Sequence, residues 1–160
     1  MESGSMLAVS ERRAALVVTA GSRACAVPLA HVIETMRPLP IEAIPGMPPF
    51  VRGLAVVRGS PAPVVDLAEA LGATETHAPT RFVLLRLGSR RAVLAVSAVV
   101  GVRDLDVVSL EQMPPLLRGA GAALVEAIGM LDAELLVVLH ATRILPEETW
   151  ERLDAHGATG

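Results

Sequence analysis

An internal repeat is the feature that most constrains how this 160-residue chain can fold. Residues 16–33 and 83–100 each contain an apolar run, the identical turn Gly-Ser-Arg and a second apolar run. Glycine supplies the positive φ of a tight hairpin turn, and the serine after it favours the turn by bonding the local backbone. Because β-branched and aliphatic residues flank both turns, each segment is predicted to be a β-hairpin.

A second pair of segments extends the repeat. Residues 54–66 and 128–140 correspond at a slightly larger offset, and both have the pattern strand, turn, strand. Each copy is therefore expected to hold a hairpin, a third strand and a later hairpin. Short strands separated by Gly and Pro favour small closed barrels, because closure removes exposed sheet edges. We predict an all-β fold of two five-stranded barrels, the first mainly 14–72 and the second mainly 80–145, with exchange of strands between them allowed.

The segments around these strands have other patterns. Residues 38–49 contain five prolines, which fix φ and remove backbone donors, so a rigid irregular connection is expected there. Residues 66–72 are predicted to be a short helix that ends at its glycine. Residues 146–156 have acids in the first turn and an apolar face, which indicates a C-terminal helix. The termini, 1–13 and 157–160, are expected to be loose.

Composition and charge weigh against several classes of partner and location. The net charge is -3 and there are only two Phe, one Trp and no Tyr, so nucleic-acid binding is not expected. The most apolar stretch, 92–102, is about half of the roughly 20 residues that span a bilayer, which argues against membrane insertion. No secretion signal is recognisable in residues 1–20, and the single Cys25 cannot form an internal disulfide. We therefore expect a cytoplasmic protein.

A search for chemistry finds no catalytic or metal-binding constellation. The histidines do not have the spacing of metal ligands; they are His31, His77, His140 and His156. Cys25 lies in an apolar strand without a nearby base, so it is expected to be a core residue. Residues 119–123 lack the glycine and lysine pattern of a phosphate-binding loop. The sequence thus predicts no metal, no cofactor and no enzymatic activity.

One polar pair distinguishes the two copies of the repeat. Glu34 is predicted to end the third strand and Arg58 the fourth, whereas Gly101 and Asp132 occupy the corresponding places in the second copy. The pair has two interpretations. It is either an ordinary ion pair at the rim, which contributes little to stability, or it fixes a strand edge that is used in recognition.

Three motifs in order carry a family resemblance. Residues 25–34 contain an apolar strand followed by Val-x-Glu, residues 44–53 form a proline-bearing loop that enters a strand, and residues 57–67 contain Arg-Gly and Pro-Val-x-Asp-Leu. These motifs resemble the CheW-like domain, the coupling protein of bacterial chemosensory arrays. The resemblance covers about Ala14 to Leu145 and continues through Val99, Met113-Pro-Pro and Ile128-Gly. This sequence departs from the family pattern at Val56, Ser97 and His140, which affects the identity of the receptor more than the fold.

The resemblance implies a single domain, 14–145, of two intertwined five-stranded SH3-like β-barrels. It also implies an adaptor without enzymatic activity. In this family one surface binds the homologous regulatory domain of a CheA-type histidine kinase. A groove between the barrels takes the cytoplasmic tip of a methyl-accepting chemoreceptor, which recruits the adaptor to membrane-associated arrays.

Carried over by position, the resemblance assigns two sets of contact residues. The receptor-binding residues would be Val32, Glu34, Gly53, Val56, Arg58 and Val99. The kinase-binding residues would be Ile44, Met47 and Phe50. A different class of function stays open at this point, namely a freestanding barrel that binds a small apolar ligand between its halves, although convergent polar groups that would orient such a ligand are lacking.

Overall fold

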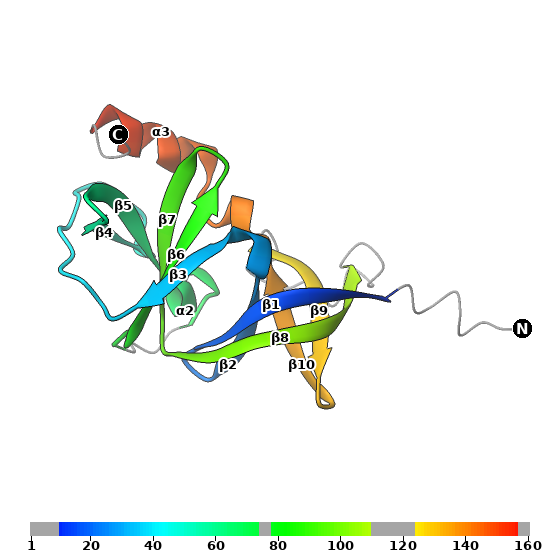
Figure 1. Ribbon diagram of the computed structural model, residues 1–160. Helices are drawn as coiled ribbons and strands as arrows, with labels where there is room; N and C mark the ends of the chain where they lie inside the picture. The colour runs from blue at the N-terminus through cyan, green and yellow to red at the C-terminus, as the bar shows by residue number, and fades with distance from the viewer. Residues whose placement is uncertain (1–9, 74–77, 110–123, 157–160) are drawn as a thin grey trace, which may run out of the picture.

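The computed structural model describes residues 10–73, 78–109 and 124–156, and nearly all of its regular structure is β-strand (Figure 1). One sheet is a closed barrel of β1 (Ser10–Ala20), β2 (Arg23–Pro28), β8 (Ala98–Ser109), β9 (Val125–Leu131) and β10 (Glu134–Leu139). The other is a five-stranded sheet of β3 (Val32–Met36), β4 (Val51–Val57), β5 (Ser60–Asp66), β6 (Arg81–Leu87) and β7 (Arg90–Val96). The predicted all-β fold of two five-stranded units is confirmed.

The two copies of the repeat exchange their first hairpins. The closed barrel has the order β1-β2-β10-β9-β8, so the β1–β2 hairpin joins strands from the second copy. The other sheet has the order β3-β6-β7-β5-β4, so the β6–β7 hairpin joins strands from the first copy. The sheet order thus includes the exchange of strands that the expected division into 14–72 and 80–145 allowed. Each hairpin finds its parallel partner in the other copy, with Cys25 opposite Val137 and Val64 opposite Val93.

The exchanged hairpins are buried on both faces. In β1, Ala15 and Val17 point into the closed barrel, whereas Leu16 and Val18 point out of it into the main core. The β6–β7 hairpin repeats this alternation between the interior of its own sheet and the main core. We call this main core, which lies between the two sheets, the central cluster. Burial on both sides explains why these strands are apolar at nearly every position.

The hairpin turns have the backbone geometry that the repeat predicts. Gly21 and Gly88 have φ of 63° and 69°, in the left-handed region that glycine adopts without strain. In the later hairpins Arg58 and Asp132 have φ of 53° and 50°. Arg58 and Asp132, which correspond in the aligned repeat, therefore also have the same backbone conformation.

The described residues include two short α-helices, both where the sequence predicts them. Helix α2 (Leu67–Ala70) begins after Asp66, whose carboxylate accepts a hydrogen bond from the Glu69 amide at 3.1 Å. Helix α3 (Glu147–Ala155) buries Trp150 and Leu153 in the central cluster. Single 3₁₀ turns, η1 (Leu29–His31) and η5 (Ala141–Arg143), follow β2 and β10.

The N-terminal segment differs from the expectation. Residues 10–13 were expected to be loose, but they are the first part of β1 and pair with β8, from Ser10 opposite Val108 onwards. The length of β8 explains this, since its far end offers backbone partners to the start of β1. The expected loose segment 157–160, and the Met113-Pro-Pro motif, lie outside the described residues.

Candidate functional site

A charged pair closes the gap between the two end strands of the second sheet. Strands β3 and β4 are at opposite ends of the sheet order, and we call the gap between their outer edges the β3–β4 seam. Arg58, in the turn after β4, donates from Nε to Glu34 Oε2 at 2.8 Å and from Nη2 to Glu34 Oε1 at 2.7 Å. This two-pronged geometry is the arrangement that arginine and carboxylate groups form most specifically. The hydrogen bonds from Arg58 hold the pKa of Glu34 below its ordinary value.

The pair lies at the surface of the first copy alone. The Arg58 side chain is 70% exposed and that of Glu34 is 27% exposed, so the guanidinium remains accessible while it holds the carboxylate. In the second copy Asp132 occupies the equivalent turn, and Gly101, at the place of Glu34, has no side chain that could pair with it. The asymmetry predicted from the sequence is thus a real difference in surface chemistry.

Three other residues that the resemblance assigns to the receptor contact are valines. Val56, two residues before Arg58, is 67% exposed on β4. Val32 on β3 and Val99 on β8 are half-buried against the central cluster. The structure therefore brings Glu34 and Arg58 into contact and leaves Val56 exposed. Val32 and Val99 both pack at the edge of the central cluster.

Two exposed valines on β8 were missed by the sequence analysis. Val100 and Val102 are 49% and 52% exposed, so apolar surface on β8 is accessible to a partner. The run from Val99 to Val102 is apolar on both faces apart from Gly101, so its pattern does not indicate which side faces water. Only the pairing of β8 with β1 and β9 determines that.

Gly53 has a role in the fold rather than at the surface. It is buried, has φ of 139°, and a Cβ built there would lie 2.1 Å from the carbonyl oxygen of Glu42. Glu42 and Leu54 exchange two backbone hydrogen bonds of 2.8 Å at this point. The absence of a side chain at Gly53 lets the preceding loop pair with the outer edge of β4.

That loop, residues 37–50, connects β3 to β4 and is called the proline-rich loop below. The three residues assigned to kinase contact, Ile44, Met47 and Phe50, are all half-buried and pack against the central cluster. Each keeps part of its surface in contact with solvent. The loop therefore presents apolar groups that are already held by the core, which suits a preformed docking surface.

A buried acid supports the end of the loop. The Phe50 carbonyl accepts a hydrogen bond of 2.8 Å from the Asp66 amide. The Asp66 carboxylate, in a residue only 7% exposed, accepts from Arg52 at 2.7 Å while it caps α2. Arg52 also pairs with Glu69 at 2.8 Å. The sequence analysis assigned no role to Arg52 or Asp66, although an acid between a strand and a helix is a recognisable capping signal.

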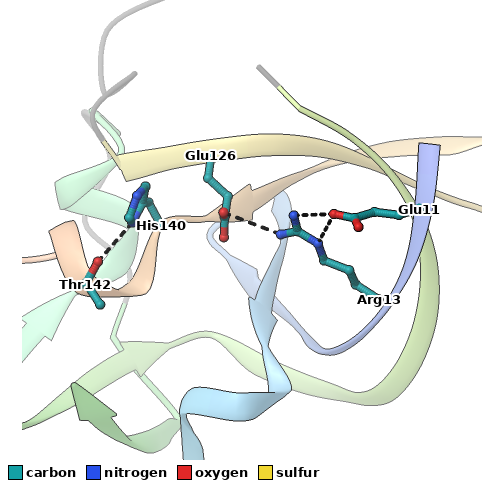
Figure 2. A network of polar contacts seen from close by, with 5 residues as sticks. All are labelled: Glu11, Arg13, Glu126, His140 and Thr142. Atoms are coloured by element: carbon teal, nitrogen blue, oxygen red, sulfur yellow. Dashed lines mark hydrogen bonds and ion pairs between the residues drawn. The ribbon is translucent and has the colours of Figure 1, made fainter. Parts of the chain in front are cut away.

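Further polar groups lie on the closed barrel (Figure 2). Arg13 on β1 donates to Glu11 at 2.6 Å and pairs with Glu126 on β9 at 3.4 Å, which joins two strands that are not hydrogen-bonded neighbours. His140, one of the departures from the family pattern, lies 3.1 Å from the Thr142 hydroxyl through its Nδ1. These contacts connect secondary structure and are separate from the β3–β4 seam.

The remaining candidate groups are structural. Cys25 is fully buried, and desolvation raises the pKa of its thiol to about 12. Across residues 10–73, 78–109 and 124–156, no three His, Cys, Asp or Glu side chains gather as a metal site would require. The same residues include no helix whose length and apolar character would let it span a bilayer. The space between the sheets is filled by the side chains of the central cluster, so the structure gives no support to an apolar ligand there.

Comparison with known proteins agrees with this architecture. The family model of the CheW-like domain matches residues 14–149. Among solved structures, the fold is similar to that of the scaffolding protein TtCheW from Thermoanaerobacter tengcongensis, with a TM-score of 0.74 and 22% identity. That match covers 84% of this chain and 92% of the TtCheW chain. Since the family model spans most of the sequence, from the first strand into α3, this chain belongs to the CheW-like domain family.

Proposed function

We propose that this protein is a non-catalytic adaptor that couples methyl-accepting chemoreceptors to a CheA-type histidine kinase. Membership of the CheW-like family supports a role as a chemotaxis adaptor. The observation that carries the proposal further is the Arg58–Glu34 pair at the β3–β4 seam. It is exposed and absent from the second copy, and Val32 on β3 and Val56 on β4 supply apolar surface on the two strands that it joins.

The receptor surface in this proposal combines the charged pair with apolar groups. The tip of a chemoreceptor is a helical hairpin, and a helix binds to a protein surface through apolar anchors spaced along one face. Val32 and Val99 supply half-buried apolar surface, and Val100 and Val102 are exposed apolar side chains on β8. Arg58 and Glu34 add charges that fix orientation and select among partners.

The kinase surface is the proline-rich loop. Ile44, Met47 and Phe50 hold their positions by packing on the central cluster, so little conformational entropy is lost when a partner covers them. The loop pairs with β4 of the second sheet, whereas Val100 and Val102 of the proposed receptor surface lie on β8 of the closed barrel. In this proposal the receptor and the kinase bind to the adaptor at the same time, as a cytoplasmic adaptor in a membrane-associated array must.

A reconstitution with three components tests the proposal. Purified adaptor is mixed with a kinase that contains its regulatory domain and with receptor fragments that contain the cytoplasmic tip. We expect a ternary complex by sedimentation and receptor-dependent phosphorylation of the kinase only when the adaptor is present. A protein that binds neither component, or that binds both without any effect on phosphorylation, would contradict the proposed coupling.

A further inference from the structure

The C-terminal helix and the proline-rich loop meet on the central cluster. Trp150 and Leu153 of α3 are buried in that cluster, and Ile44, Met47 and Phe50 pack against it from the loop. Figure 1 shows α3 at the same end of the molecule as the β4–β5 pair, although half of the chain separates Asp66, the last residue of β5, from Glu147, the first residue of α3. The two segments are therefore neighbours in the fold and distant in the sequence.

One hydrogen bond joins them directly. Arg152 of α3 donates from Nη1 to the carbonyl oxygen of Gly46 at 3.1 Å, across 106 positions of sequence. Gly46 lies between Ile44 and Met47 and has φ of 83°, so the chain turns sharply where it accepts this bond. The contact thus fixes the middle of the apolar segment.

Backbone hydrogen bonds also hold the loop on either side of this apolar segment. Glu42 pairs with Leu54 through two backbone hydrogen bonds of 2.8 Å. At the other side of the apolar segment, Val51 donates to the Pro48 carbonyl at 2.9 Å, and the Phe50 carbonyl is also bonded. Gly46 is the point between these anchors, and Arg152 reaches it from another part of the fold.

Helix α3 is itself firmly placed. Arg90, at the start of β7, donates from its two terminal nitrogens to Glu147 at 3.1 and 3.0 Å, and its guanidinium lies 4.8 Å from the ring centroid of Trp150. The same arginine approaches Asp154 at 3.7 Å. These contacts hold both ends of α3 against the β6–β7 hairpin, so the helix can act as a rigid support.

We propose that Arg152 is a positioning residue for the kinase surface, because its bond to Gly46 holds Ile44 and Met47 in the orientation that the partner meets. The inference rests on the proposed function of the loop as the kinase contact. Without the bond, the middle of the loop samples more conformations, and ordering it on binding costs affinity. Helix α3 is then part of the interaction machinery although Arg152 need not touch the partner.

The test compares three variants of the full chain. Arg152→Met keeps the length of the side chain and removes its donors, Arg152→Lys keeps a donor, and Arg143→Met removes the same charge from an exposed arginine of η5. The readouts are ¹⁵N order parameters of the Gly46 and Met47 amides and calorimetric affinity for the kinase regulatory domain. Thermal melts check the fold.

Arg152→Met should lower both order parameters and weaken kinase binding about two- to tenfold, the range expected for one hydrogen bond. Arg152→Lys should recover part of both effects, and Arg143→Met should change neither. Unchanged order parameters in Arg152→Met would overturn the inference. If Phe50→Ala weakens kinase binding and Arg152→Met does not, only the positioning role of Arg152 is wrong. If Phe50→Ala binds the kinase normally, the loop is not the kinase contact, and the positioning role of Arg152 is wrong as well.

Discussion

The guanidinium of Arg58 donates to both carboxylate oxygens of Glu34, at 2.8 and 2.7 Å, across the β3–β4 seam. No backbone ladder joins these two strands, so side chains make the connection that hydrogen-bonded strands make elsewhere in the sheet. Exposed ion pairs add little to folding stability, because water competes for both partners and ordering the side chains costs entropy. The pair is therefore expected to matter more for recognition than for the fold.

Arg58→Ala should leave the melting temperature within about 4 °C of the parent, because its side chain is 70% exposed. It should strongly reduce receptor-stimulated phosphorylation, since the variant loses the charge that the receptor surface presents. Thermal melts and the reconstituted kinase assay measure the two quantities.

Asp132→Ala is the matched control, because Asp132 occupies the equivalent turn of the second copy with nearly the same φ. It should change neither quantity by much. If Arg58→Ala unfolds the protein, or if both variants signal normally, the asymmetry of the repeat has no functional meaning.

Phe50→Ala should weaken binding of the kinase regulatory domain by about 2 kcal/mol or more, the effect of losing an aromatic anchor at an interface. Phe50 is half-buried on the central cluster, so melts must show that the variant stays folded. Val102→Ala, on the closed barrel, should bind the kinase normally. Calorimetric titration measures the affinity of each variant for the kinase regulatory domain. Equal affinity of the parent and Phe50→Ala would mean that Phe50 is a core residue and not a kinase contact.

Gly53→Ala should destabilise the fold by about 2–4 kcal/mol, since the new Cβ meets the Glu42 backbone and the positive φ is strained. Gly59→Ala is the control, because φ there is 80° and a Cβ at that position has open space around it. We expect it to cost about 1–2 kcal/mol, from backbone strain alone. Urea unfolding of both variants measures the difference, and equal losses would contradict the close approach.

Asp66→Ala should lower the free energy of unfolding by about 1–3 kcal/mol. The substitution removes the cap of α2 and leaves Arg52 without its shortest contact, at a residue that is 7% exposed. Asp66→Asn keeps an oxygen for the cap and should recover part of the loss. Chemical unfolding measures the free energy of unfolding of both variants. An Asn variant as unstable as the Ala variant would mean that the negative charge of Asp66, and not the cap of α2, supplies the stabilisation.

The pKa of the Glu34 carboxyl should lie below its ordinary value and should rise in Arg58→Ala. Because the folded-state pKa is depressed, the stabilisation is fully present above the ordinary carboxyl pKa and is lost as pH falls through the folded value. The same sign holds for Glu147, whose pKa Arg90 lowers. NMR titration of the carboxyl carbons measures both groups. A Glu34 pKa that is the same in parent and variant would mean that the pair does not persist in solution.

The repeat made the fold class predictable because turn geometry is local. Gly21 and Gly88 impose hairpins wherever their segments lie, and Asp66 caps a helix through its own amide neighbours. The short helices are predictable for the same reason. Their conformations depend on residues a few positions apart in the chain.

The candidate site was only partly predictable. Glu34 and Arg58 stood out because one copy has them and the other does not, and the structure joins them. Val100 and Val102 did not stand out, because an apolar run gives no sign of which face remains exposed. The inference on Arg152 depends on a backbone oxygen 106 positions away, which no sequence motif records.

The sequence by itself determined the strands, their turns, the duplication and the charge asymmetry between the copies. The tertiary structure alone decided which strands share a sheet. Both hairpins are apolar on two faces, so their pattern fits pairing within a copy as well as between copies. Exchange between the copies places one face of each hairpin inside a sheet and the other in the central cluster, and burial of that second face is a property of the whole fold.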